Sequence, residues 1–278
     1  MKVHFSKYQG TGNDFIIIDN RHLNWHPEEM EIAFLCNRRF GIGADGLMLL
    51  SSVSGYDFAM AYYNSDGKES TMCGNGGRCI TAFARSLGLI DDMTRFFAVD
   101  GPHEAKVLSA SNRDYSVRLK MKDTSIGKIL DEGIFIDTGS PHFVTMRKNV
   151  AEMDVYHEGK VLRHDSRFGS AGSNINFLEF LPDGLYVRTY ERGVEDETLS
   201  CGTGVTASAL VTAFLHQDNP GFYHVSTRGG NLLVTFNQDG NSFNNICLEG
   251  PVGYVFSGEV DLEPETLNKE FRTLNLKP

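Results

Sequence analysis

The same four-residue turn occurs twice in this chain, each time directly before an apolar segment of helical length. Cys73-Gly74-Asn75-Gly76 precedes residues 77–87, and Cys201-Gly202-Thr203-Gly204 precedes residues 205–215. In both halves, a tyrosine, a polar residue and an acid-containing turn come before the cysteine. A chance repeat is the weaker interpretation, because the chain has only five cysteines in 278 residues. The pattern predicts a duplicated unit, with one copy in each half of the chain and a functional site formed by both copies.

The segments around these turns predict a strand-rich, mixed α/β fold. Helices are expected over residues 27–40, where a proline lies near the start and a glycine just past the end, and over 77–87 and 205–215. Runs of β-branched, aromatic and aliphatic residues bounded by turn residues predict strands. The predicted strands are 3–8, 15–19, 46–51, 58–64, 96–99, 104–108, 115–121, 134–137, 143–146, 174–180, 185–190, 222–226, 231–236, 245–249 and 253–260.

A polar stretch at residues 122–133 separates two blocks of predicted structure and is the expected linker. Each block contains one Cys-Gly turn and one apolar helix. We therefore expect two lobes. The first is placed at residues 1–121 together with 251–278, and the second at residues 122–250.

A cysteine directly before a helix meets groups that favour its charged form. The N–H groups of the first turn have no partner within the helix, and the helix macrodipole is positive at that end. Both effects can lower the pKa of a thiol below its ordinary value of about 8.5. The glycines allow a bound carboxylate to approach these N–H groups closely. Cys73 and Cys201 are therefore candidate reactive thiols, each beside an anion site.

Two such turns that face each other would place one thiol on each side of a small zwitterion. Inverting a stereocentre by proton transfer needs a base on one face of a carbon atom and an acid on the other, and a thiolate and a thiol suit these roles. Backbone N–H groups would stabilise the carboxylate in a carbanion-like transition state. Cys36, Cys79 and Cys247 lie in apolar patterns without such a turn, and we expect them to be small buried hydrophobic residues.

Neither a metal nor an organic cofactor is expected. The chain has no Cys-x-x-Cys pair, and five residues separate Cys73 from Cys79, which does not match a zinc site. Lys68 and Lys148 lack the surroundings of a Schiff-base lysine, so pyridoxal phosphate is not implied. The G-x-G-x-x-G string at 41–46 follows a predicted helix and precedes a strand, which reverses the order of a dinucleotide-binding turn.

The acidic composition limits the partners and the location. Asp and Glu number 36 against 26 Lys and Arg, and this net charge of -10 argues against a nucleic acid or an anionic membrane as the partner. The longest apolar runs are far shorter than the roughly 20 residues of a membrane-spanning helix, and the N-terminus lacks a signal-peptide pattern. An odd number of cysteines favours a reducing compartment, so we expect a cytoplasmic protein.

The motifs resemble those of the diaminopimelate epimerase family, cofactor-independent enzymes of bacterial lysine and peptidoglycan-precursor synthesis. The most specific strings are Met72-Cys73-Gly74-Asn75-Gly76-Gly77-Arg78-Cys79 and Ser200-Cys201-Gly202-Thr203-Gly204. The other matching segments, in chain order, are Gly10-Thr11-Gly12-Asn13-Asp14-Phe15, Gly41-Ile42-Gly43-Ala44-Asp45-Gly46, Tyr63-Asn64-Ser65-Asp66-Gly67, Pro141-His142, Asn174-Ile175-Asn176-Phe177 and Tyr190-Glu191-Arg192-Gly193.

The resemblance implies two pseudo-symmetric α/β lobes, each a mixed curled sheet or barrel around a central helix, with the active site in the cleft between them. It implies interconversion of LL- and meso-2,6-diaminopimelate, and it suggests a homodimer. Cys73 and Cys201 fall on the catalytic pair, and His142 and Glu191 fall on positions that support the thiols. The matches to substrate-binding positions are Asn13, Asn64, Gly74, Asn75, Asn174, Glu191, Arg192, Gly202 and Thr203.

Two positions depart from the family pattern. The residue before Pro141-His142 is Ser140, where the family usually has Asn, and the G-I-G motif ends in Gly46, where many members have Gln. In the family both positions help to hold the substrate. Ser140 has a shorter side chain than asparagine, and Gly46 offers only its backbone. The shape of the distal pocket is therefore not predicted, whereas the chemistry is.

The residues themselves leave other interpretations. Asn13, Asn64 and Asn174 suit turns as well as a zwitterionic ligand, and His142 suits a structural role as well as a catalytic one. A proline or hydroxyproline racemase would use a similar cysteine pair. A redox switch would use two facing thiols to form a reversible disulfide. The Glu191-Arg192 pair favours a substrate that carries both an ammonium group and a carboxylate.

Overall fold

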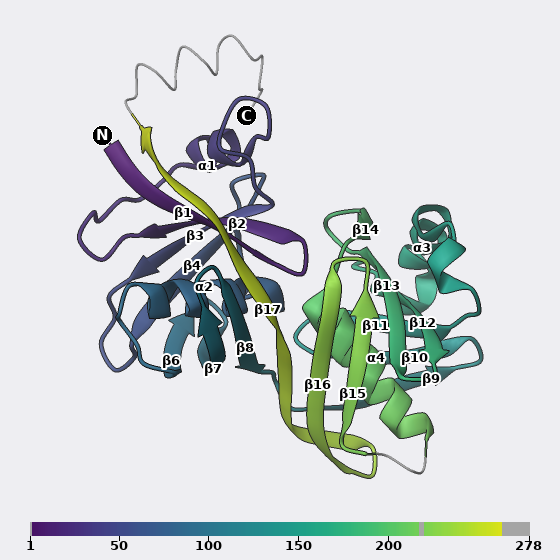
Figure 1. Cartoon of the computed structure of the whole chain (residues 1–278). Coiled ribbons are helices and arrows are strands. Elements are labelled where there is room, and N and C mark those ends of the chain that lie inside the picture. The colour runs from purple at the N-terminus through teal and green to yellow at the C-terminus, as the bar shows by residue number, and fades with distance from the viewer. Residues whose placement is uncertain (1, 217–219, 263–278) are drawn as a thin grey trace. The chain divides into compact units, whose positions relative to one another are not determined.

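The computed structural model describes residues 2–216 and 220–262 (Figure 1). The chain divides into two compact units. Within the described residues, the first comprises 2–72, 76–117 and 252–262, and the second comprises Cys73–Asn75, 118–216 and 220–251. Residues 263–278, which we expected in the first lobe, lie outside the described part of the chain, as does Met1.

The first unit is built mainly from strands, with two α-helices. Its elements are β1 (Lys2–Gly10), β2 (Asn13–Asp19), α1 (Glu29–Cys36), β3 (Gly46–Ser51), β4 (Phe58–Asn64), β5 (Glu69–Ser70), α2 (Gly74–Ser86), β6 (Met93–Ala98), β7 (Gly101–Ser111) and the start of β8 (Asp114–Lys120). The long strand β17 (Ser242–Asp261) begins in the second unit and continues in the first, where it pairs with β1.

The second unit repeats this composition. Its elements are β9 (Thr124–Leu130), β10 (Gly133–Asp137), β11 (Pro141–Met146), α3 (Val155–Arg163), β12 (Asn174–Leu181), β13 (Gly184–Glu191), β14 (Asp196–Thr198), α4 (Gly202–Leu215), β15 (Phe222–Thr227), β16 (Gly230–Asp239) and the first half of β17, with short 3-10 turns at Val150–Glu152 and Ser166–Phe168. Among the helices described, none is long and apolar enough to cross a membrane.

The strand pairings recur in the same order in both units. In the first, β1–β2 is antiparallel, β2–β3 parallel, β3–β4 antiparallel, β4–β6 parallel and β6–β7 antiparallel. In the second, β10–β11, β11–β12, β12–β13, β13–β15 and β15–β16 follow the same sequence of directions. Helices α1 and α3 lie between the strands of the first parallel pair of each unit, and α2 and α4, which follow the short strands β5 and β14, lie between those of the second. The expected mixed α/β fold of two similar lobes is confirmed.

The sheet of the second unit closes on itself around α4. Pairings run from β9 through β10, β11, β12, β13, β15, β16 and β17 and return to β9. Helix α4 contacts six of these strands, and nearly all its residues up to Ala213 are buried (Figure 1). A helix that is apolar on all faces is stable only inside such an enclosure.

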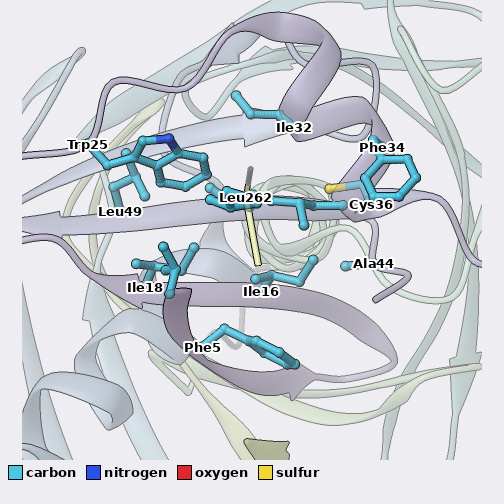
Figure 2. Close-up of a cluster of buried hydrophobic side chains, with 13 residues drawn as sticks. Phe5, Ile16, Ile18, Trp25, Ile32, Phe34, Cys36, Ala44, Leu49 and Leu262 are labelled. Carbon is cyan, nitrogen blue, oxygen red and sulfur yellow. The ribbon is translucent and has the colours of Figure 1, made fainter. Parts of the chain in front are cut away.

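A cluster of buried hydrophobic side chains in the first unit lies between α1 and the strands β1 to β3 (Figure 2). It includes Phe5, Ile16 and Ile18 from the strands, and Trp25 from the loop before α1. Cys36 is part of this cluster, and burial raises the pKa of its thiol to about 12. The expectation that Cys36 acts as a small hydrophobic residue agrees with this position.

Two expected elements differ from the structure. The helix predicted over 27–40 ends at Cys36, because the Asn37 side chain accepts hydrogen bonds from the N–H groups of Arg39 and Phe40 and turns the chain. The expected linker 122–133 is wrong: it forms β9, which pairs with β10 and β17 and closes the sheet. Its polar composition reflects an exposed strand.

Candidate active site

The two Cys-Gly turns meet inside the second unit, to which Cys73–Asn75 belongs. A Cβ atom on Gly74 would lie 3.4 Å from the Cα atom of Gly202, and one on Gly202 would lie 3.2 Å from the Cα atom of Gly74. The Leu248 side chain would lie 3.0 Å from either Cβ atom. The glycines therefore allow a backbone-to-backbone approach that larger residues would oppose.

A side-chain hydrogen bond strengthens this contact. Nδ2 of Asn75 donates to the backbone oxygen of Ser200 over 2.9 Å. Ser200 directly precedes Cys201, and Asn75 lies two residues after Cys73, so the bond holds the two cysteine turns in register. Helices α2 and α4 each begin at the residue after the cysteine.

Cys201 is a buried free thiol with 7% of its surface exposed, and burial raises its pKa well above the usual range. The negative charge of Glu191 raises the pKa further, and Cys73 is close enough to add to this effect. Hydrogen bonds from the Thr203 hydroxyl and the Gly204 N–H lower it by less. The expected lowering of the pKa at this helix start is therefore wrong for Cys201, because desolvation outweighs the helix N-terminus.

His142 is fully buried on β11 and hydrogen-bonded through both ring nitrogens. Nε2 lies 2.9 Å from Oγ1 of Thr203, and Nδ1 lies 3.0 Å from Nδ2 of Asn176. Burial and the nearby positive charge of Arg192 lower the pKa of His142 to about 3, against a partial opposing effect of the Asn176 hydrogen bond. The ring is therefore neutral at physiological pH and cannot act as a charged acid.

The end of β13 brings Glu191 and Arg192 to the start of β12. The Thr198 hydroxyl donates to Oε2 of Glu191 over 3.0 Å. The amide oxygen of Asn174 accepts from the backbone N–H of Arg192 over 2.8 Å, while its Nδ2 donates to Oγ of Ser140 over 2.9 Å. Asn174 thus fixes the backbone around Arg192 as well as the Ser140 hydroxyl.

Asn13 and Asn64 lie in the first unit, at one end of its sheet. Asn13 begins β2, and Asn64 ends β4, where it pairs in register with Gly46. Nδ2 of Asn13 donates to Oδ2 of Asp45 over 2.8 Å. Because the amide nitrogen is used in this way, the amide oxygen of Asn13 is left to accept a further hydrogen bond.

Comparison with known proteins decides the family. The family model for diaminopimelate epimerase matches residues 5–121 and 134–255. A diaminopimelate epimerase of Flavobacterium psychrophilum is 50% identical over 253 residues, which cover 90% of this chain and 97% of that protein. One from Chlorobaculum tepidum is 42% identical over 262 residues, covering 91% and 99%. The chain belongs to the diaminopimelate epimerase family. As a member of this family it is an isomerase of the epimerase type.

Solved structures share the fold of this family member at much lower sequence identity. A phenazine biosynthesis protein of the PhzF family from Bacillus anthracis has a TM-score of 0.74 at 15% identity, covering 94% of this chain and all of that one. A hydroxyproline epimerase from Agrobacterium vitis has a TM-score of 0.72 at 15% identity, covering 96% and 94%. At these identities the likeness concerns the fold alone.

In this diaminopimelate epimerase family member, most of the predicted site residues gather in the second unit around the paired turns. These are Cys73, Gly74, Asn75, His142, Asn174, Glu191, Arg192, Cys201, Gly202 and Thr203. Asn176 and Thr189 extend the hydrogen bonds beyond His142 and were not among the predicted site residues. A signal existed for Asn176: by the alternation of a strand it shares a face of β12 with Asn174, and it is fully buried.

The two departures from the family pattern have different local settings. A Cβ atom on Gly46 would lie 2.6 Å from both the Tyr62 ring and the backbone oxygen of Tyr63, so this position has no room for a side chain. Ser140 instead keeps a polar group, which accepts from Asn174. Within residues 2–216 and 220–262, no three His, Cys, Asp or Glu side chains are grouped so as to hold a metal ion.

Proposed function

We propose that this protein interconverts LL- and meso-2,6-diaminopimelate in lysine biosynthesis, without a cofactor, by proton transfer between Cys73, Cys201 and the α-carbon. The observation that carries the proposal is the close packing of Gly74 against Gly202, which brings the two cysteine turns together. The names of the relatives support the substrate, since proteins 50% and 42% identical are diaminopimelate epimerases.

In the proposed reaction, one thiol is charged and the other is not. Burial keeps Cys201 protonated at neutral pH, so it acts as the acid in one direction of the reaction. Cys73 then acts as the thiolate base. The S–H bond of Cys201 breaks as a C–H bond forms on one face of the α-carbon, and Cys73 takes the original proton from the other face. The roles exchange in the reverse direction.

The substrate carboxylate at the reacting centre is proposed to bind the N–H groups at the starts of α2 and α4. Gly74, Asn75, Gly202 and Thr203 would supply these groups. The N–H groups in the first turn of a helix and the helix macrodipole both favour an anion there. They stabilise the negative charge that develops when the α-proton leaves.

The other groups of the substrate are assigned by charge. Glu191 is proposed to bind an ammonium group and Arg192 a carboxylate. Asn174 holds the Arg192 backbone, and Asn13 offers its amide oxygen, since its nitrogen is bound to Asp45. Asn64 is also assigned to substrate binding. A substrate with two amino-acid ends satisfies this set better than proline, which has one ammonium and one carboxylate.

The test is proton NMR of the reduced protein with LL-diaminopimelate, meso-diaminopimelate, L-proline and trans-4-hydroxy-L-proline in parallel. We expect interconversion of the two diaminopimelates and no reaction of the prolines. Cys73→Ala and Cys201→Ala should each lose almost all inversion activity. Inversion of proline instead would favour the racemase alternative. A thiol redox switch would give no inversion at all and a reversible Cys73–Cys201 disulfide on oxidation.

We further propose that the protein acts in the cytoplasm and as a homodimer. A reducing compartment keeps the two reactive thiols from oxidising, which supports the location. The dimer rests on the family resemblance. Size-exclusion chromatography with light scattering distinguishes a dimer from a monomer of 30.9 kDa.

A further inference from the structure

A chain of buried hydrogen bonds leads from the core of the second unit to the sulfur of Cys201. The Thr189 hydroxyl donates to Oδ1 of Asn176 over 2.9 Å. Nδ2 of Asn176 lies 3.0 Å from Nδ1 of His142, and Nε2 of His142 lies 2.9 Å from Oγ1 of Thr203. Oγ1 of Thr203 in turn lies 3.4 Å from Sγ of Cys201.

The direction of the first bonds is fixed by a carbonyl group. Nδ2 of Asn176 also lies 3.3 Å from the backbone oxygen of Phe143, which can only accept a hydrogen bond. The amide of Asn176 must therefore present its NH₂ group to both Phe143 and His142. Its oxygen accepts from the Thr189 hydroxyl, so both halves of the amide are satisfied in this orientation and not in the flipped one.

The donor of the next hydrogen bond follows from which ring nitrogen of His142 carries the proton. Because Asn176 donates to Nδ1, that nitrogen of His142 carries no proton, and in a neutral imidazole the proton must lie on Nε2. Nε2–H therefore donates to Oγ1 of Thr203. The Thr203 hydroxyl proton cannot point back at His142, and its remaining partner is the sulfur of Cys201.

We propose that Asn176 and His142 are positioning residues that fix the Thr203 hydroxyl as a hydrogen-bond donor to the sulfur of Cys201. The proposal rests on the epimerase function given above and refines it. When Cys201 gives its proton to the α-carbon, its sulfur becomes a thiolate, and the Thr203 O–H already points at it. The same bond stabilises that thiolate when Cys201 acts as the base in the reverse direction.

Packing and charge support this arrangement. A Cβ atom on Gly204 would overlap Oδ1 of Asn176 and would lie 3.3 Å from a ring carbon of His142, so the first turn of α4 is pressed against both. Two charged groups act on this chain of hydrogen bonds, which we call the relay. Arg192 lowers the pKa of His142, and Glu191, together with Cys73, raises the pKa of Cys201. Arg192 therefore favours a neutral ring, and Glu191 favours the protonated thiol of Cys201.

The first experiment compares Thr203→Val with Thr203→Ser. Valine keeps the shape and removes the hydroxyl, whereas serine keeps the hydroxyl. Loss of a hydrogen bond to a charged group predicts a kcat about 10- to 100-fold lower for T203V, with kcat for T203S within a few-fold of wild type. Thr212→Val is the matched control, since that buried hydroxyl donates only to the Ser208 carbonyl within α4, and it should leave kcat unchanged.

The second experiment changes the direction of the relay. Asn176→Asp replaces the donor with an acceptor, so the proton of a neutral His142 should move to Nδ1 and Nε2 should accept from Thr203. This is the reverse of the tautomer change caused by replacing an aspartate beside a catalytic histidine with asparagine. Long-range ¹⁵N–¹H NMR of the full-length protein reads the tautomer directly, at a pH where the ring is neutral.

We expect wild type to carry the ring proton on Nε2 and N176D to carry it on Nδ1, with kcat lowered as in T203V. The double variant N176D/T203V should be no slower than T203V, because both remove the same bond. A wild-type ring protonated at Nδ1, or equal kcat values for T203V and T203S, would overturn the proposal. The tautomer of the wild-type His142 ring can be measured even if N176D does not fold.

These outcomes are distinct from failure of the proposed function. If wild-type protein does not invert either diaminopimelate, the function fails, while the tautomer of His142 remains measurable. If wild type is active and T203V is equally active, the epimerase function holds and the relay is refuted.

Discussion

Gly74 and Gly202 pack backbone against backbone, with each Cα atom within 3.4 Å of the place where the other residue would carry a Cβ atom. This contact fixes the separation of two turns that lie 128 residues apart in the chain, from residue 74 to residue 202. It also explains why both copies of the turn have glycine directly after cysteine. The proposed catalytic geometry thus depends on two residues without functional side chains.

Gly202→Ala should impair catalysis far more than stability. Alanine favours a helix over glycine by about 1 kcal/mol, which offsets part of the cost of crowding Gly74 and Leu248. We expect kcat to fall at least about 10-fold as the cysteines separate, with little change in Tm. Steady-state kinetics and thermal unfolding measure the two effects. Gly253→Ala is the control, since its new Cβ meets mainly the end of the flexible Gln9 side chain; equal kcat values for the two variants would contradict the argument.

Asp14 should contribute stability that disappears in acid. Its carboxylate bonds to Arg38 and to Lys7, which is only 8% exposed, and these bonds outweigh the effect of burial and lower its pKa from 3.8 to about 2. Because the folded pKa is the lower one, the contribution is complete above pH 4 and is lost as the pH falls towards 2.

Asp14→Asn should therefore lower the free energy of unfolding at pH 7 by at least about 2 kcal/mol, since it also leaves the buried Lys7 ammonium without its carboxylate. Urea unfolding at pH 7 and pH 3 measures the difference, which should shrink at the lower pH. Asp66→Asn is the control, because its ion pair with Lys68 is exposed and long at 3.7 Å. A difference that does not depend on pH would refute the carboxylate explanation.

His142 should make the protein lose stability in mild acid. Its pKa in the folded protein is about 3, below the ordinary value of 6.5, because burial disfavours the charged ring. The unfolded chain therefore takes up a proton first, and stability falls as the pH drops below 6.5, with a slope of about 1.4 kcal/mol per pH unit from this residue. A pH series of chemical unfolding should show that slope missing in His142→Asn. Parallel curves for the two proteins would show that His142 does not titrate on unfolding.

Gly46→Gln should not restore the side chain that many family members carry. The Tyr62 ring and the Tyr63 carbonyl fill the place of its Cβ atom at 2.6 Å, and the carbonyl belongs to a paired strand that cannot easily move. Overpacking of this kind costs about 1–3 kcal/mol. We expect a lower Tm and a higher KM for diaminopimelate. Ser140→Asn, at a position that already carries a polar side chain, should be tolerated much better; equal destabilisation by the two variants would contradict this account.

The sequence pattern predicted the parts of the site that carry a local signature. The repeated Cys-Gly turn and the apolar run after it predicted the helices α2 and α4 that begin after Cys73 and Cys201, because glycine, cysteine and helix patterning are encoded within a few residues. It also predicted the duplication, which the strand pairings of the two units repeat.

Properties set by distant residues could not be predicted in this way. The pKa of Cys201 depends on its burial and on Glu191, which no local pattern reveals, and desolvation reversed the expected shift. The relay through Asn176 depends on strand alternation and on the Phe143 carbonyl. The stretch 122–133 appeared to be a linker because β9 is a polar strand whose residues are mostly exposed.

Deuterium labelling during the first turnovers tests the two-thiol account most directly. LL-diaminopimelate is incubated with reduced enzyme in D₂O, and the reaction is stopped well before equilibrium. Two bases on opposite faces predict meso product with one deuterium at the inverted carbon, while the recovered LL substrate keeps its hydrogen. Product that retains its original hydrogen, or substrate that exchanges as fast as product forms, would show a single base and contradict the pairing of Cys73 with Cys201.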